Sequence, residues 1–178
     1  MKEYWKTLSS KVVHENNWYK IVKKKFLMPN SKIGDYYILQ TNGSSLVVPV
    51  KDGKIILCEQ FRYPINKFSI EVPGGSVKVG SNHLKTAKEE LKEEIGYSGK
   101  LKKIGEFSSL NGVSSEISVI YLATDLKYVG KMPEATEEFK IFEVRIKDVY
   151  KMIEEGKIID SMTVVALFIA KKYLYKEK

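Results

Sequence analysis

The feature that most constrains the fold of this chain is an acidic segment that ends at a glycine, EELKEEIGY at residues 89–97. On a helix of 3.6 residues per turn, Glu90, Glu93 and Glu94 fall within roughly 100° of one face. Like charges at this spacing repel one another by roughly 0.2–0.5 kcal/mol per pair. Two interpretations are open. The face either binds a hard divalent cation such as Mg²⁺, which prefers oxygen ligands, or it is a solvated helix surface.

The residues around the acidic face indicate an amphipathic helix that follows a glycine loop. An adjoining apolar stripe can pack on a sheet, and it consists of Leu84, Ala87 and Leu91. Ser81 or Asn82 can cap the start of the helix, and Gly96 is suited to its end. Upstream, residues 71–75 read as a short strand that runs into two glycines. The unit is therefore predicted to be strand, glycine loop and acidic helix.

This unit resembles the signature of the Nudix hydrolases. The family's box runs Gly, five residues, Glu, seven residues, Arg-Glu, an aliphatic residue, any residue, Glu-Glu, any residue, Gly and an apolar residue. Here Gly75 opens the box, and residues 90–91 and 93–97 match it without an insertion. Two positions depart from the pattern: Ser81 stands where the family has Glu, and Glu89 stands where it has Arg.

The wider sequence is similar to the ADP-ribose pyrophosphatase branch of that family. The likeness covers the opening strands with Trp18, the segment EQFRYP at residues 59–64, and EVPGG at residues 71–75. The segment GEF at residues 105–107 resembles the start of the branch's loop after the box. That loop usually carries a proline where Asn111 stands here.

The resemblance implies a metal site on the box helix. Glu90 and Glu94 would be the main ligands, Glu93 would assist catalysis and metal binding, and the carbonyl of Gly74 would complete the site. The expected ion is Mg²⁺, with Mn²⁺ as a possible substitute. Such ions neutralise diphosphate oxygens and lower the pKa of the attacking water.

The resemblance also implies a general base in a late loop just before a strand. Residues 133–139 occupy that place, where Glu138 matches best and Glu137 is the second choice. A charged surface loop is the alternative for both.

Four further residues are implied as substrate contacts. Arg62 is one of only two arginines among 30 lysines and arginines, which favours a bidentate role on phosphate; a structural ion pair is the alternative. Trp18 and Tyr36 would stack on the base, one from each subunit of a homodimer, or else lie in the core. Glu116 stands where some branch members carry an extra acid that contacts metal or substrate.

Composition sets the broader class of protein. The 178 residues carry a net charge of +8, so polyanions are candidate partners, but the lysines are spread along the chain and nucleic-acid binding is not favoured. No apolar run approaches the roughly 18 residues of a membrane span. The single Cys58 cannot form an internal disulfide, and the start MKEYWKTLSS lacks the apolar stretch of a signal peptide, so a cytoplasmic protein is expected.

The expected fold is α+β, a Nudix-type α/β/α sandwich with a mixed sheet and an antiparallel N-terminal strand appendage. Residues 1–43 would form that appendage, used for dimerisation and substrate contacts, and residues 44–178 the hydrolase domain. Expected strands are 8–15, 18–27, 34–41, 45–50, 54–61, 69–72, 100–108, 116–123 and 139–145, and expected helices begin near 82, 147 and 161. Asp52-Gly53 predicts a tight hairpin turn.

The leading hypothesis is metal-dependent hydrolysis of the diphosphate bond in a nucleoside diphosphate derivative. ADP-ribose is the first candidate, and its products would be AMP and ribose 5-phosphate. Three alternatives stay open: a nucleotide-binding module weakened in catalysis by the changes at Ser81 and Glu89, a hydrolase of another sugar nucleotide or dinucleotide, and a hydrolase of RNA 5′ ends.

Overall fold

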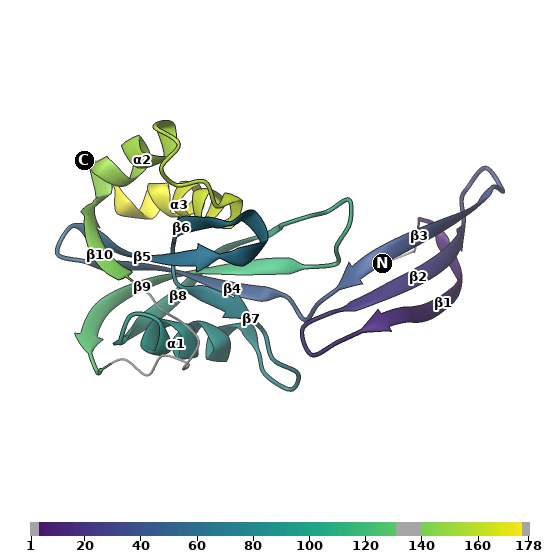
Figure 1. The fold of residues 1–178 in the computed structure, drawn as a ribbon, viewed down its shortest axis with the longest axis horizontal. Helices are drawn as coiled ribbons and strands as arrows, with labels where there is room; N and C mark the ends of the chain where they lie inside the picture. Colours follow the sequence, from purple (N-terminus) through teal and green to yellow (C-terminus); the bar gives the residue numbers. More distant parts are fainter. Residues whose placement is uncertain (1–3, 131–139, 176–178) are drawn as a thin grey trace.

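The computed structural model describes residues 4–130 and 140–175 of the chain. A three-stranded antiparallel sheet comes first, built from β1 (Lys6–Glu15), β2 (Lys20–Leu27) and β3 (Ile33–Gln40) in the order β1-β2-β3. Figure 1 shows that this sheet stands beyond one end of the rest of the molecule. The expected antiparallel N-terminal strands are therefore confirmed as a separate sheet. The division of the chain at residues 43 and 44 into two domains stays a prediction.

The second sheet is mixed and forms the body of the protein. Its main path runs β10-β5-β4-β9-β8, while β6 pairs with β5 and β7 pairs with β4. The β4–β9 pair is parallel and the other pairs are antiparallel. The strands are β4 (Ser44–Lys51), β5 (Lys54–Arg62), β6 (Lys67–Glu71), β7 (Gly74–Ser76), β8 (Tyr97–Ser108), β9 (Ile117–Tyr128) and β10 (Lys140–Arg145).

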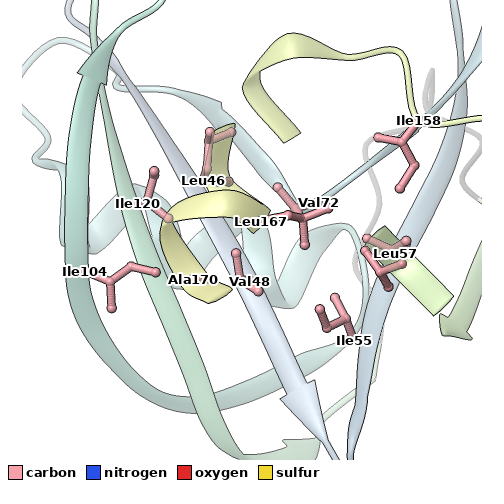
Figure 2. Packing of buried hydrophobic residues seen from close by; sticks show 12 residues of the cluster. Leu46, Val48, Ile55, Leu57, Val72, Ile104, Ile120, Ile158, Leu167 and Ala170 are labelled. Atoms are coloured by element: carbon pink, nitrogen blue, oxygen red, sulfur yellow. The ribbon is translucent and has the colours of Figure 1, made fainter. Parts of the chain in front are cut away.

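Helices cover both faces of this sheet, as Figure 1 shows. On one face α1 (His83–Glu93) packs on a core that includes Val47 and Ile56. On the other face α2 (Ile146–Glu154) and α3 (Ser161–Leu174) cover a core with Val48, Ile55 and Leu167 (Figure 2). Because both faces are covered, neighbouring residues of β4 and β5 are buried on opposite sides. The predicted α/β/α sandwich is confirmed.

Local chemistry explains the ends of α1. The side chain of Asn82 accepts a hydrogen bond from the backbone N–H of Lys85 at 2.9 Å, so Asn82 is the cap at the start. Gly96 has a φ of 78°, a left-handed conformation suited to glycine, just beyond the end. One detail of the predicted stripe is wrong: Leu84 is 41% exposed, and Thr86 is buried beside Ala87 instead.

The hairpin between β4 and β5 turns where predicted. Asp52 and Gly53 have φ values of 49° and 72°, the pair of positive angles that a two-residue turn between twisted strands requires. Three strands differ from expectation. The three-residue β7 was not anticipated, and β8 and β9 each run several residues further than the sequence pattern indicated.

Candidate active site

A cavity of about 500 Å³ brings the acidic end of α1 together with the glycine loop. Its walls come from the α1 end, from β7 and the residues after it, from the end of β5 and from the β1–β2 turn. The lining residues are Asn17, Trp18, Asn42, Gln60, Arg62, Gly74, Gly75, Ser76, Val77, Lys78, Val79, Glu90, Glu93 and Glu94. Three acids predicted from the box thus share one cavity with both glycines.

The glycines fit tightly against the box acids. The backbone N–H of Gly74 donates a hydrogen bond to Oε2 of Glu94 at 3.0 Å. A Cβ atom on Gly75 would overlap the carboxylate of Glu90, and one on Gly74 would come within 2.7 Å of the carbonyl oxygen of Ser45. Both positions therefore need glycine because a side chain would displace either the acid or the neighbouring strand.

The donor set of this cavity fits a hard divalent cation. Glu94 lines the cavity and is only 5% exposed, so its carboxylate is largely shielded from bulk solvent. Within residues 4–130 and 140–175, no three acidic, histidine or cysteine side chains meet closely enough to form a complete metal cage. Mg²⁺ does not require one, because it is usually held by one or two carboxylates together with substrate phosphates and water.

Arg62 forms an ion pair and also lines the cavity. Its Nε donates to Oε1 of Glu71 at 2.9 Å, and its Nη2 donates to the other carboxylate oxygen. These hydrogen bonds raise the pKa of Arg62 above its usual value. The sequence left a choice between phosphate contact and structural ion pair. The structure shows the ion pair, and the place of Arg62 on the cavity wall leaves the phosphate role as a prediction.

Trp18 and Tyr36 lie in different cavities of the same chain. Trp18 lines the cavity with the box acids and is 76% exposed. Tyr36 lines a separate cavity of about 460 Å³ between the three-stranded sheet and the β8–β9 loop, and its hydroxyl donates to the carbonyl of Gly112 at 2.5 Å. One chain therefore does not place both rings on the same base.

The remaining predicted residues lie elsewhere. Glu116 lines a smaller cavity of about 200 Å³, which shares Arg62 and residues 74–76 with the larger one. Glu137 and Glu138 lie outside the described residues, so their predicted role as general base stays a prediction.

The two departures from the box are structurally separate from the acid face. Glu89 pairs with Lys85 across one helical turn at 3.8 Å. The hydroxyl oxygen of Ser81 is buried and has no hydrogen-bond partner among the described residues. Neither residue lines the cavity that holds the box acids.

Sequence reasoning missed three kinds of cavity residue. Gln60 and Lys78 line the wall, and Asn17 and Asn42 approach from the side of the three-stranded sheet. Gln60 was within reach of prediction, since it stands beside Arg62 in the segment EQFRYP. Lys78 and the asparagines carried no pattern, because only the fold brings them to the acids.

Comparison with known proteins decides the family. The model of the NUDIX domain matches residues 41–161. The chain belongs to the Nudix family. A second model, described as the nucleoside diphosphate sugar hydrolase N-terminal domain, matches residues 5–39, where the three-stranded sheet lies.

Relatives of this Nudix protein match most of its length. An ADP-ribose pyrophosphatase of Bacillus subtilis is 34% identical over 144 residues, covering 79% of this chain and 78% of that protein. A methanol dehydrogenase activator of Bacillus methanolicus is 26% identical and covers 91% and 90%. A crystal structure of an ADP compounds hydrolase superposes with a TM-score of 0.86 at 19% identity, over 97% and 95% of the two chains, and it shares the fold.

The predicted membership of the Nudix pyrophosphohydrolases is confirmed at the level of the family. The individual roles given to the box acids, Arg62 and the aromatic residues stay predictions. Among the residues that the structure describes, no helix has the length and apolarity needed to cross a membrane.

Proposed function

We propose that this Nudix hydrolase cleaves the diphosphate bond of a nucleoside diphosphate derivative, with ADP-ribose as the first substrate to test. AMP and ribose 5-phosphate would be the products. The observation that carries the proposal is the single cavity in which Glu90, Glu93 and Glu94 face the glycine loop and Arg62. Such a cavity combines acids that can hold divalent cations with a cation that can bind phosphate oxygens.

The chain's own residues have distinct tasks in this reaction. Glu90 and Glu94 would hold the divalent ion with the carbonyl of Gly74, and Glu93 would assist them. The guanidinium of Arg62 would bind a phosphate oxygen and orient the diphosphate. Mg²⁺, or Mn²⁺ in its place, would neutralise the phosphate charge when bound and would lower the pKa of the attacking water. Glu138, or else Glu137, would serve as the general base that accepts a proton from the attacking water.

The nature of the substrate is supported by Trp18 and by the relatives. An exposed indole beside the acids offers a stacking surface for a base, and such stacking tolerates any base. The relatives named as ADP-ribose pyrophosphatases and the match to an N-terminal domain of nucleoside diphosphate sugar hydrolases favour a sugar on the other side of the diphosphate.

We also propose that the protein is a homodimer joined through its N-terminal sheet. On the strands of that sheet the exposed large apolar side chains include Leu8, Val12, Val13, Ile33, Tyr36 and Tyr37, and Trp5 is exposed just before β1. Exposed apolar patches of this kind mark interaction surfaces. A dimer would also let Tyr36 of one subunit approach the base held by Trp18 of the other. A monomer by light scattering would contradict this arrangement.

A cytoplasmic location remains our proposal for the compartment. It rests on Cys58, the single cysteine, which is buried at the centre of β5. Its burial raises the pKa of the thiol, so the group stays protonated and unreactive. A chain without disulfides suits a reducing compartment.

The decisive experiment is hydrolysis of a panel of nucleoside diphosphate derivatives with Mg²⁺ and then Mn²⁺. Cleavage of ADP-ribose that stops when a chelator removes the metal is the expected result. Cleavage of another sugar nucleotide or dinucleotide alone would correct the substrate. A folded protein that binds nucleotides but cleaves none would contradict the proposal and favour a binding module, in line with the changes at Ser81 and Glu89.

RNA with a 5′ triphosphate or a capped end belongs in the same panel. Preference for RNA should appear as affinity above that for mononucleotides, and this affinity should fall steeply with salt. We expect neither, because the lysines are dispersed rather than gathered at the cavity.

A further inference from the structure

A buried carboxylate holds the arginine of the candidate active site. Glu71 ends β6 and its side chain is 9% exposed, whereas that of Arg62 at the end of β5 is 46% exposed. Both oxygens of Glu71 accept hydrogen bonds from Arg62, one of them from Nε at 2.9 Å. Gln60 adds a third donor at 3.3 Å. The carboxylate of Glu71 is thus held by two side chains of β5, and it is almost fully buried.

The backbone around Glu71 is also fixed. Residues 58–62 of β5 pair with residues 67–71 of β6 in an unbroken antiparallel register. The next residue, Val72, donates its N–H to the buried hydroxyl of Thr163 on α3 at 3.1 Å. Glu71 is therefore anchored between the sheet and α3, three residues before Gly74.

We propose that Glu71 is a positioning residue that holds the Arg62 guanidinium toward the substrate diphosphate and away from the metal ligand Glu94. This inference rests on the proposed function, because it takes Arg62 as a phosphate contact and Glu94 as a metal ligand.

The geometry of the ion pair supports the first part. A guanidinium has five N–H donors in a rigid plane, and Glu71 occupies two of them, those on Nε and Nη2. Three donors remain on a side chain that lines the cavity with the box acids. Because the plane is clamped at two points, these donors are pre-oriented, and less conformational freedom is lost when they bind phosphate.

The charges around Arg62 support the second part. Two further carboxylates act on its charge, Glu94 and Asp160. Arg62 and Glu94 line the same cavity. If the carboxylate at position 71 were neutral, Glu94 would become a strong attractor of the guanidinium, and a bound guanidinium would compete with a metal ion for its oxygens.

A purely structural role would not require this arrangement. Buried ion pairs contribute little to stability compared with well-packed apolar residues. Here the Arg62 side chain stays 46% exposed and lines the cavity, so the ion pair does not serve to bury it in the core.

The test compares the wild-type protein with Glu71→Gln, with the double variant Arg62→Gln/Glu71→Gln, and with a control, Glu59→Gln. Glutamine keeps the shape of Glu71, but its NH₂ group would face the Arg62 donors and displace the guanidinium. The double variant removes that cation together with its partner. Glu59 lies on β5, the strand that carries Arg62. It pairs with Lys140 at 3.7 Å and does not line the cavity.

Two measurements are made on each protein, and its fold is checked by circular dichroism. Binding of Mn²⁺ without nucleotide is followed by electron paramagnetic resonance. Binding of the non-hydrolysable α,β-methylene analogue of ADP-ribose in Mg²⁺ is followed by calorimetry. For Glu71→Gln we expect affinity for the analogue to fall about tenfold or more, and Mn²⁺ affinity to fall severalfold.

The double variant separates positioning from general damage. We expect its Mn²⁺ affinity to return to within about twofold of wild type, because no guanidinium is left to compete, while the analogue stays weakly bound. The proposal is overturned if Glu71→Gln binds both ligands like wild type or like Glu59→Gln. It is also overturned if the double variant loses Mn²⁺ as fully as the single one.

Failure of the proposed function would look different. In that case the wild-type protein would cleave no nucleoside diphosphate derivative, whether or not it bound the analogue. The Mn²⁺ comparison among the four proteins uses no nucleotide, and it would still decide whether Glu71 keeps Arg62 away from Glu94.

Discussion

The backbone N–H of Gly74 donates a hydrogen bond to the carboxylate of Glu94 at 3.0 Å, joining the glycine loop to the end of the box helix. The contact fixes the position of a buried acid relative to the Gly74 carbonyl, which is another expected oxygen ligand. One strand end and one helix end are thereby combined into a single site.

Replacing Glu94 by Gln should abolish turnover and preserve the fold. The amide oxygen of glutamine can still accept the Gly74 hydrogen bond, but the side chain loses the charge that a divalent ion needs. We expect kcat to fall by about 100-fold or more, while the melting temperature stays within about 4 °C. Glu89→Gln is the matched control on the same helix, outside the cavity, and it should keep kcat. Full activity in Glu94→Gln would show that Glu94 is not a metal ligand.

Replacing Gly75 by Ala should damage the site more than the fold. The added Cβ would overlap the carboxylate of Glu90, the flexible end of a side chain that can swing aside. Metal-dependent activity should therefore fall about tenfold or more at little cost in stability. Gly112→Ala, whose Cβ would meet open space, is the control. Equal kcat in the two variants would contradict the prediction.

Replacing Trp18 by Ala should weaken substrate binding and leave the chemical step intact. Loss of one base-stacking contact costs about 1–3 kcal/mol, so KM should rise roughly 5- to 150-fold with kcat little changed. Steady-state kinetics on the substrate found in the panel would measure this. Tyr63→Ala removes an exposed ring outside the cavity and should leave KM unchanged. A drop in kcat alone would argue against stacking.

Alkaline pH should destabilise the protein partly through Tyr150. Burial raises the pKa of this phenol to about 12, and its hydroxyl donates to the Leu167 carbonyl at 2.9 Å. The unfolded chain loses this proton near pH 10 and the folded chain near pH 12, so stability is full below pH 10 and falls as pH rises to about 12.

Tyr150→Phe removes that dependence. Denaturant unfolding at pH 9 and pH 11.5 should show a smaller loss for the variant than for wild type, by about 1 kcal/mol after allowance for the partial exposure of the ring. Equal losses in both proteins would mean that Tyr150 does not carry the effect.

Local elements were predictable because their determinants lie close together in the chain. Asp52-Gly53 fixed a turn through backbone angles that favour those two residue types. Gly96 marked the end of the box helix for the same reason. Its start was predicted at Ser81 or Asn82, and the structure shows that the side chain of Asn82 forms the capping hydrogen bond. Leu84 was assigned wrongly, because the buried face of the helix runs through Thr86, Ala87 and Leu91 and leaves Leu84 41% exposed.

The ion pair of Arg62 with Glu71 was not predictable from the order of residues alone. Both lie in segments that resemble the family, but the register of β5 and β6 pairs Arg62 with Lys67 and Glu71 with Cys58. The contact therefore depends on the directions in which the two side chains extend along the sheet.

Trp18 and Tyr36 are separate because Trp18 lies in the β1–β2 turn, whereas Tyr36 lies on β3 opposite Lys24. The sequence pattern predicted that both residues belong to the N-terminal strands. It could not predict which cavity each ring would line.

By itself the sequence determined the glycine-and-acid spacing, and with it the helix that carries Glu90, Glu93 and Glu94 and the family to which the chain belongs. Those features depend on backbone preferences and on helical periodicity, which act over a few residues. Only the tertiary structure decided that Gly74 would bind Glu94, that Glu71 would pair with Arg62, and that Lys78 would line the same cavity as the acids. These contacts join residues whose distance in space is set by strand order and packing.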